Sequence, residues 1–314
     1  MRTGSATPIF GLNVAHASVP WVIEHLLSAG RAFHAIQYAG HHLKDVPSKL
    51  FIRVLTEAVS AKASEDANEN MMFQHYVERI FEKLDKDSSV PEDEIAKLEW
   101  SYLKLLEFSS RTPKTLPKLI ATSPQFFIEV LSTAYKSNHD EKGLDPEAPD
   151  YQVRASMATQ AWSLLHNWKH VPGLSNGKID GAQIEKWIRE TRILAAKADR
   201  AEIGDVQIGQ VLAHAPADDD GVWPCIPVRE VIEITRSAEL ENGIYTGVFD
   251  KRGVTTRSPT DGGIQERELA QTYQAWSEKT RLEYPRTSAV LGKIAEGYER
   301  DAQHHDDNAE RNQW

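Results

Sequence analysis

Apolar side chains recur along most of this chain at the three- and four-residue spacing of α-helices. In the stretch from Ile95 to Tyr135 they occupy more than one helical face. Leu98 and Tyr102 belong to one face, whereas Trp100 and Leu103 belong to another. Because a helix that is apolar on several sides is buried between neighbours, this stretch predicts a central helical pair against which the other helices pack.

Prolines and capping residues mark where the predicted helices begin. In Ser123-Pro124, the Ser hydroxyl can accept hydrogen bonds from the free N–H groups of the first helical turn. The Pro that follows has no N–H group, so it needs no partner at this position. Helix starts recur near Pro20, Pro47, Met71, Pro91 and Pro124, a spacing of about two dozen residues. The regularity predicts an all-α fold built as an irregular array of antiparallel helix pairs, which is HEAT-like or solenoid-like.

The amino-acid composition of the chain changes in its last third. Gly, Pro and Asp become frequent after Ile203, and the segment IYTGVF from Ile244 to Phe249 alternates as a strand does. We therefore predict a helical array over residues 1–200 and a loop-rich helical C-terminal subdomain, packed on it, over residues 201–314. The final segment DAQHHDDNAERNQW is expected to be a solvated tail.

Charge and cysteine content narrow the function classes. Lys and Arg number 36 against 46 Asp and Glu, so the formal net charge is −10. This balance argues against broad nucleic-acid binding, which needs many cations, but not against a local basic patch. Cys225 is the only cysteine, which excludes an intrachain disulfide and a Cys-rich zinc site. The lone cysteine suits a reducing cytoplasm.

We also expect no membrane segment and no secretory signal. The sequence contains no stretch that is long and apolar enough to span a bilayer. Gly11 and Asn13 interrupt the apolar run near the N-terminus, whereas the apolar region of a secretory signal is continuous. A cytoplasmic location is the expectation.

His166 and His170 lie four residues apart, as the two zinc ligands of many metalloproteases do. Those enzymes need a Glu directly after the first His as general base, and here that position holds Asn167. Two histidines near a helix C-terminus, where they interact with its dipole, explain the pattern. A metal-dependent hydrolase that adds a carboxylate from elsewhere to these two histidines stays open as a third hypothesis. We predict no catalytic residue, no metal site and no cofactor.

The segment DKRGVTTRSPTDGGIQERE, residues 250–268, is the best candidate for a binding site. The candidate residues are Lys251, Arg252, Arg257, Gly262, Gly263 and Arg267. Free N–H groups at a helix start and forked guanidinium groups attract phosphate or carboxylate. The glycine spacing matches neither the Walker fingerprint nor the dinucleotide-binding fingerprint. The alternative is that the arginines tie the closing helices to the array through Asp261, Glu266 and Glu268, because structural ion pairs are common.

Four segments carry a resemblance: LEWSYL around Trp100, SPQFFIEVL around Phe126, GVFDKRGVTTRSPTDGGIQERELA from Gly247, and EYPRTSAVLGKIAEGYERDA from Glu283. They resemble the C-terminal helical region of large bacterial proteins of unknown function. The resemblance implies a bacterial cytoplasmic module, the tail of a longer polypeptide, within a defence or regulatory system. It implies no activity and no catalytic residues.

The leading functional hypothesis is a non-catalytic protein–protein interaction or scaffold module. It would bind a protein partner or a neighbouring domain through faces of the helix array and the loop at residues 251–263. The alternative is a nucleic-acid- or nucleotide-responsive subunit in which the same loop contacts phosphate.

Overall fold

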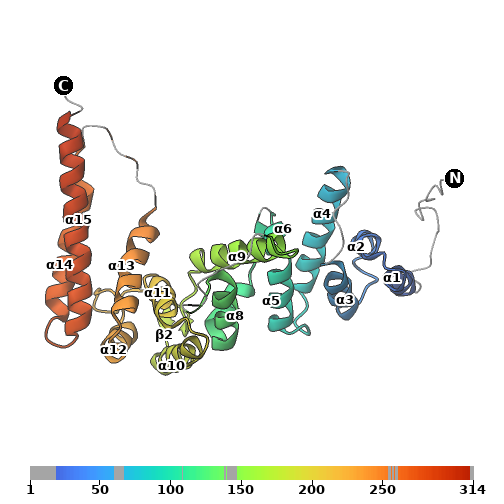
Figure 1. Ribbon diagram of the computed structural model, residues 1–314, viewed down its shortest axis with the longest axis horizontal. Coiled ribbons are helices and arrows are strands. Elements are labelled where there is room, and N and C mark those ends of the chain that lie inside the picture. Colours follow the sequence, from blue (N-terminus) through green and yellow to red (C-terminus); the bar gives the residue numbers. More distant parts are fainter. Residues whose placement is uncertain are drawn as a thin grey trace. The chain divides into compact units, whose positions relative to one another are not determined.

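The protein is all-α, as the sequence predicted. The computed structural model describes residues 19–59, 67–107, 109–137, 139, 147–253, 256, 258 and 261–311, with only the backbone of 67–70 and 107. These residues hold fifteen helices and one two-stranded antiparallel sheet (Figure 1). None of the helices in this part of the chain has the length and apolar character that a membrane crossing requires.

The chain forms two compact units, Met1–Leu119 and Ile120–Trp314. The helices of the first unit are α1 (Val19–Ser28), α2 (Ala32–His41), α3 (Ser48–Ala58), α4 (Ala67–Leu84), α5 (Glu92–Ser101) and α6 (Leu103–Glu107). Helix α7 (Leu116–Thr122) lies across the division between the units. The predicted starts at Pro20, Pro47 and Pro91 are each within two residues of an observed helix start.

Helices two apart in sequence pack together in the first unit: α1 with α3, α2 with α4, and α3 with α5. Their apolar rows make one core, in which Phe51 and Phe81 are fully buried. The Tyr102 hydroxyl donates a hydrogen bond of 2.7 Å to the carbonyl of Leu55, which anchors the end of α5 on α3. Gly30, with a φ of +68°, makes the turn between α1 and α2.

The stretch from Ile95 to Tyr135 is not one helical pair, and this prediction is wrong in detail. It contains four short helices, and it crosses the division between the units. After α6 the chain is held by buried Glu99, whose carboxylate accepts hydrogen bonds of 2.6–3.0 Å from three backbone N–H groups at residues 114–116. Buried Arg111 lies 2.6 Å from both Glu99 and Asp85. These charge-assisted contacts stabilise a connector that periodicity alone cannot detect.

The second unit continues with the remaining elements. They are α8 (Pro124–Ala134), α9 (Tyr151–His166), β1 (Leu174–Ser175), β2 (Lys178–Ile179), α10 (Gly181–Lys197), α11 (Ala201–Leu212), α12 (Ile226–Thr235), α13 (Ala238–Arg252), α14 (Ile264–Thr280) and α15 (Pro285–Arg311). Helices α8, α10 and α12 pack in one row, and α11, α13 and α15 in another. Alternate helices that pack in rows are typical of a solenoid-like array. The predicted caps form, since Ser123 Oγ accepts from Phe126 N and Asp180 Oδ1 from Gln183 N.

Glycines bring α11 and α13 into backbone contact. A Cβ at Gly209 would lie 2.1 Å from the carbonyl oxygen of Leu240, and one at Gly243 would lie 2.2 Å from that of Val206. A Cβ at Gly247 would likewise lie close to the carbonyl oxygen of Gln210. Gly247 is four residues beyond Gly243 on α13, and Gln210 is four residues beyond Val206 on α11, so the contacts advance in the same direction along both helices. The two helices therefore run parallel, and only hydrogen atoms separate their backbones along this row.

The last third is more helical than the sequence predicted. The segment from Ile244 to Phe249, which alternates as a strand does, lies inside α13, where Gly247 packs against α11. The segment expected to be a solvated tail continues α15 to Arg311, with Ala302 and Ala309 buried. Helices α14 and α15 form an antiparallel hairpin (Figure 1), in which Ser277 Oγ donates to the carbonyl of Ser288 at 2.8 Å.

The predicted division at residues 200/201 lies within the second unit, between α10 and α11. Arg200 is part of the fold there. Its Nε donates 2.8 Å to the carbonyl of Tyr135, and its Nη1 donates 2.5 Å to the carbonyl of Ala198. The two helices on either side of this residue pack on each other. The compact units divide at 119/120 instead.

Candidate functional site

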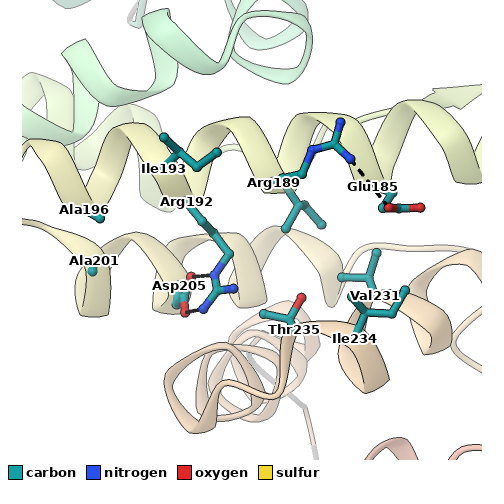
Figure 2. A pocket seen from close by; sticks show the side chains of 11 residues that line it. Glu185, Arg189, Arg192, Ile193, Ala196, Ala201, Asp205, Val231, Ile234 and Thr235 are labelled. Carbon is teal, nitrogen blue, oxygen red and sulfur yellow. Dashed lines mark hydrogen bonds and ion pairs between the residues drawn. The ribbon is translucent and has the colours of Figure 1, made fainter.

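A groove on the surface of the second unit has a volume of about 420 Å³. We call it the α10–α12 groove, because these two helices form its sides and α11 forms its floor (Figure 2). Its lining residues are Glu185, Ile188, Arg189, Arg192, Ile193, Ala196, Ala201, Asp205, Val231, Ile234 and Thr235.

The groove follows from the spacing of side chains on its two sides. On α10, Ile188, Arg192 and Ala196 recur every four residues and so lie on one face. On α12, Val231 and Ile234 lie three residues apart, on the face that Figure 2 shows turned toward α10. Parallel rows of side chains border the groove on two sides, as in the groove between packed helices.

Large aliphatic side chains are exposed at this groove. Ile234 is 65% exposed and Ile193 is 51% exposed, whereas Ile188 and Val231 beneath them are buried. Single exposed apolar residues are ordinary on protein surfaces, but several around one concave surface mark a site of interaction.

The charged groups of the groove are paired with one another. Arg192 makes a forked contact from α10 to α11, with Nε 2.9 Å from Asp205 Oδ1 and Nη2 3.1 Å from Asp205 Oδ2 (Figure 2). Arg189 Nη1 lies 3.8 Å from Glu185 Oε1 on the same helix. Because two guanidinium groups face two carboxylates, the groove has no net charge to attract a charged ligand, and its apolar surface dominates.

The structure places five of the six residues of the predicted basic loop at the end of α13 and the start of α14. Lys251 and Arg252 end α13, Gly262 and Gly263 precede α14, and Arg267 lies in the first turn of α14. The remaining candidate, Arg257, lies outside the described residues.

The cations of this loop contact groups of the protein itself. Arg252 Nη2 lies 2.5 Å from Oε1 of Glu266, whose side chain is fully buried, and the Arg252 guanidinium lies 5.5 Å from the ring centroid of Tyr298. Arg267 pairs with Asp306 of α15. Lys251 Nζ donates 3.3 Å to the carbonyl of Ala213. These contacts are of the kind expected from the alternative interpretation of the loop, in which its arginines form ion pairs that hold the closing helices in place.

The two glycines of the loop allow the chain to approach α15 closely. The N–H of Gly263 donates 2.8 Å to Asp306 Oδ1, and a Cβ on Gly263 would lie 2.2 Å from the carbonyl of Ala302. The free N–H group at the start of α14 is therefore used by a carboxylate of the same chain. Binding of an external anion at this loop stays a prediction.

The two histidines of the third hypothesis lie at the last residue of α9, His166, and four residues beyond it, His170. The His166 ring stacks on Trp162 of α9, with a centroid distance of 5.0 Å. Within the described ranges, no group of three His, Cys, Asp or Glu side chains could hold a metal ion. Cys225 is buried, and burial raises the pKa of its thiol, which keeps it protonated and weakly nucleophilic.

Sequence reasoning missed the groove because its residues come from three helices. The one hint was on α10, where Ile188 and Ile193 are five residues apart and therefore cannot both face one core. When an amphipathic helix carries an aliphatic residue outside its buried face, that side chain does not pack in the core and can contact another surface.

Neither a family model, nor a curated protein, nor a solved structure matches this chain.

Proposed function

We propose that this protein is a non-catalytic protein–protein interaction module that binds an amphipathic α-helix of a partner protein in the α10–α12 groove. The observation that carries the proposal is the concave surface of about 420 Å³ with exposed Ile193 and Ile234 at its edge. In keeping with the sequence resemblance, the module would act in the bacterial cytoplasm as part of a larger regulatory or defence system.

The shape of the groove favours a helix over an extended peptide. Its sides are rows of side chains at the three- and four-residue spacing on α10 and α12, and rows of this kind accept the i, i+3, i+4 residues of another helix. An extended peptide gains affinity by pairing with the edge of a sheet. Here the backbone groups bordering the groove are already hydrogen-bonded within helices.

The charge pattern favours an apolar face on that helix. Because Arg192 is paired with Asp205 and Arg189 with Glu185, an apolar ligand leaves no groove cation without its partner. A strongly charged ligand face would have to compete with these pairs, and its desolvation would reduce the affinity. We therefore expect aliphatic residues on the buried side of the bound helix.

Site-specific photo-crosslinking tests the proposal. A benzophenone amino acid replaces Ile234 in the groove or, as a matched control, Val153 on α9, which is 63% exposed. Crosslinks formed in the native host are mapped by mass spectrometry. The expected result is one partner segment captured from position 234 and not from 153, with aliphatic residues at helical spacing.

A second variant checks that binding energy resides in the groove. Ile234→Asp places a charge where the partner's apolar face would lie, and we expect at least about tenfold weaker binding of the captured segment, a change of about 1.4 kcal/mol. Val153→Asp should leave the affinity unchanged. Equal crosslinking from both positions, or equal affinity of both variants, would show that the groove is not the binding surface.

A further inference from the structure

A second, smaller pocket of the C-terminal unit contains a buried arginine. It has a volume of about 210 Å³ and lies between the chain preceding α12 and the turn that joins α14 to α15. Its lining residues are Asp220, Val222, Arg229, Lys279, Thr280, Glu283 and Tyr284. A pocket of this size is below the range of drug-sized ligands and suits a small molecule.

Arg229 is 4% exposed, and its guanidinium lies 5.7 Å from the ring centroid of Tyr284. Its Nε donates 2.6 Å to the carbonyl of Pro224 and its Nη2 donates 2.8 Å to that of Val222. These carbonyls orient the guanidinium but carry no charge. In the described part of the chain, the one carboxylate within ion-pair distance is Asp220, at 3.4 Å, and its side chain is largely exposed.

Two arginines elsewhere in the described residues have closer carboxylate partners. Arg111 lies between two carboxylates at 2.6 Å, and the Arg252 guanidinium lies 2.5 Å from fully buried Glu266. Removing a cation from water is costly unless an anion compensates it. Nη1 of Arg229, which the described residues provide with no hydrogen-bond acceptor, can therefore take one from a ligand in the pocket.

The rim of the pocket carries charges of both signs. Lys279 is exposed on α14 and makes no ion pair within the described ranges, so its ammonium is available beside the guanidinium. Asp220 and Glu283 are also exposed on the rim. A simple anion would be attracted by the two cations and repelled by the two carboxylates. A ligand that carries one group of each sign is complementary to both pairs.

We propose that this pocket binds a small zwitterion, a free α-amino acid, with its carboxylate toward Arg229 and Lys279 and its ammonium toward Asp220 and Glu283. This site is separate from the α10–α12 groove and does not depend on the function proposed for that groove. It would let the concentration of a small metabolite stabilise the turn between α14 and α15.

Binding is tested by isothermal calorimetry of the full chain with each of the twenty free L-amino acids. For the amino acid that binds most tightly, the N-acetyl derivative lacks the ammonium and the amide derivative lacks the carboxylate. We expect each derivative to bind at least about tenfold more weakly, because each one loses a hydrogen bond between two charged groups.

Variants then locate the site. Lys279→Ala changes an exposed rim residue, so it should fold normally and bind the amino acid at least about tenfold more weakly. Lys197→Ala, which removes an exposed cation at the end of α10, should bind as the unchanged protein does. The proposal is overturned by absence of binding for all twenty amino acids at 10 mM, by equal affinity of the N-acetyl derivative, or by full binding in Lys279→Ala.

Discussion

The backbone contact between α11 and α13 predicts that one methyl group at Gly209 destabilises the protein. In Gly209→Ala the new Cβ would lie 2.1 Å from the Leu240 oxygen and 2.8 Å from Gly243 Cα. Ordinary contacts begin at 3.4 Å, so the helices would have to separate by up to 3.4 − 2.1 = 1.3 Å. No rotamer change can relieve the overlap, because both atoms belong to the backbone.

The size of the effect follows from two opposing contributions. Overpacking of a tight interface costs about 1–3 kcal/mol, whereas replacing a helical Gly with Ala stabilises a helix by about 1 kcal/mol. We expect a net loss of about 2 kcal/mol, because the separation would also open the contacts at Gly243 and Gly247. Gly292→Ala is the matched control, since its Cβ would meet only Ser277 Oγ, at 3.5 Å. That variant should gain up to about 1 kcal/mol.

Urea unfolding of the full-length variants, followed by circular dichroism, measures the difference. The expected order of midpoints is Gly292→Ala, then the unchanged protein, then Gly209→Ala. The reasoning fails if Gly209→Ala unfolds at the same urea concentration as Gly292→Ala, because the close approach of α11 and α13 would then not exist in solution.

The Arg252–Glu266 ion pair and the half-buried His214 give two further predictions. Arg252→Met removes the guanidinium that lies 2.5 Å from buried Glu266 and should lower the free energy of unfolding by about 3–5 kcal/mol in urea unfolding. Arg267→Met removes a partly exposed pair and should lower it by about 1 kcal/mol or less. Burial lowers the pKa of His214 from 6.5 to about 4, so the unfolded chain binds more protons between these pH values. Stability should therefore fall as the pH decreases from 6.5 to 4. In His214→Gln this loss should be smaller by on the order of 1 kcal/mol, after allowance for partial exposure. Equal pH dependence of the two proteins in thermal unfolding would contradict the assignment.

The local features of the fold could be predicted from the sequence. Helical periodicity and prolines identified α1, α3 and α5, and capping residues identified the starts of α8 and α10, because these features depend on residues a few positions apart. The strand-like alternation from Ile244 to Phe249 does not give a strand. Gly243 and Gly247 pack that segment on α11, and this tertiary contact outweighs local preference.

The candidate sites depend on contacts that are distant in sequence. The α10–α12 groove combines residues from Glu185 to Thr235, and Asp306 reaches Arg267 from 39 positions away. The basic loop was predicted as a binding site from its composition, but composition does not show which acidic groups of the same chain lie beside each arginine. That information is present only once α14 and α15 are paired.

The glycine contact between α11 and α13 also affects the free energy with which a ligand would bind in the α10–α12 groove. The backbones of α11 and α13 touch, and α10 and α12, which also pack on each other, border the groove beside α11. Because α11 lines the groove through Ala201 and Asp205, its main-chain contact with α13 limits how far this part of the groove can move. A groove restrained in this way is preorganised, so a partner helix would spend little of its binding free energy on rearranging the protein. Affinity would then respond to substitutions at Gly209 or Gly243, although neither residue touches the ligand.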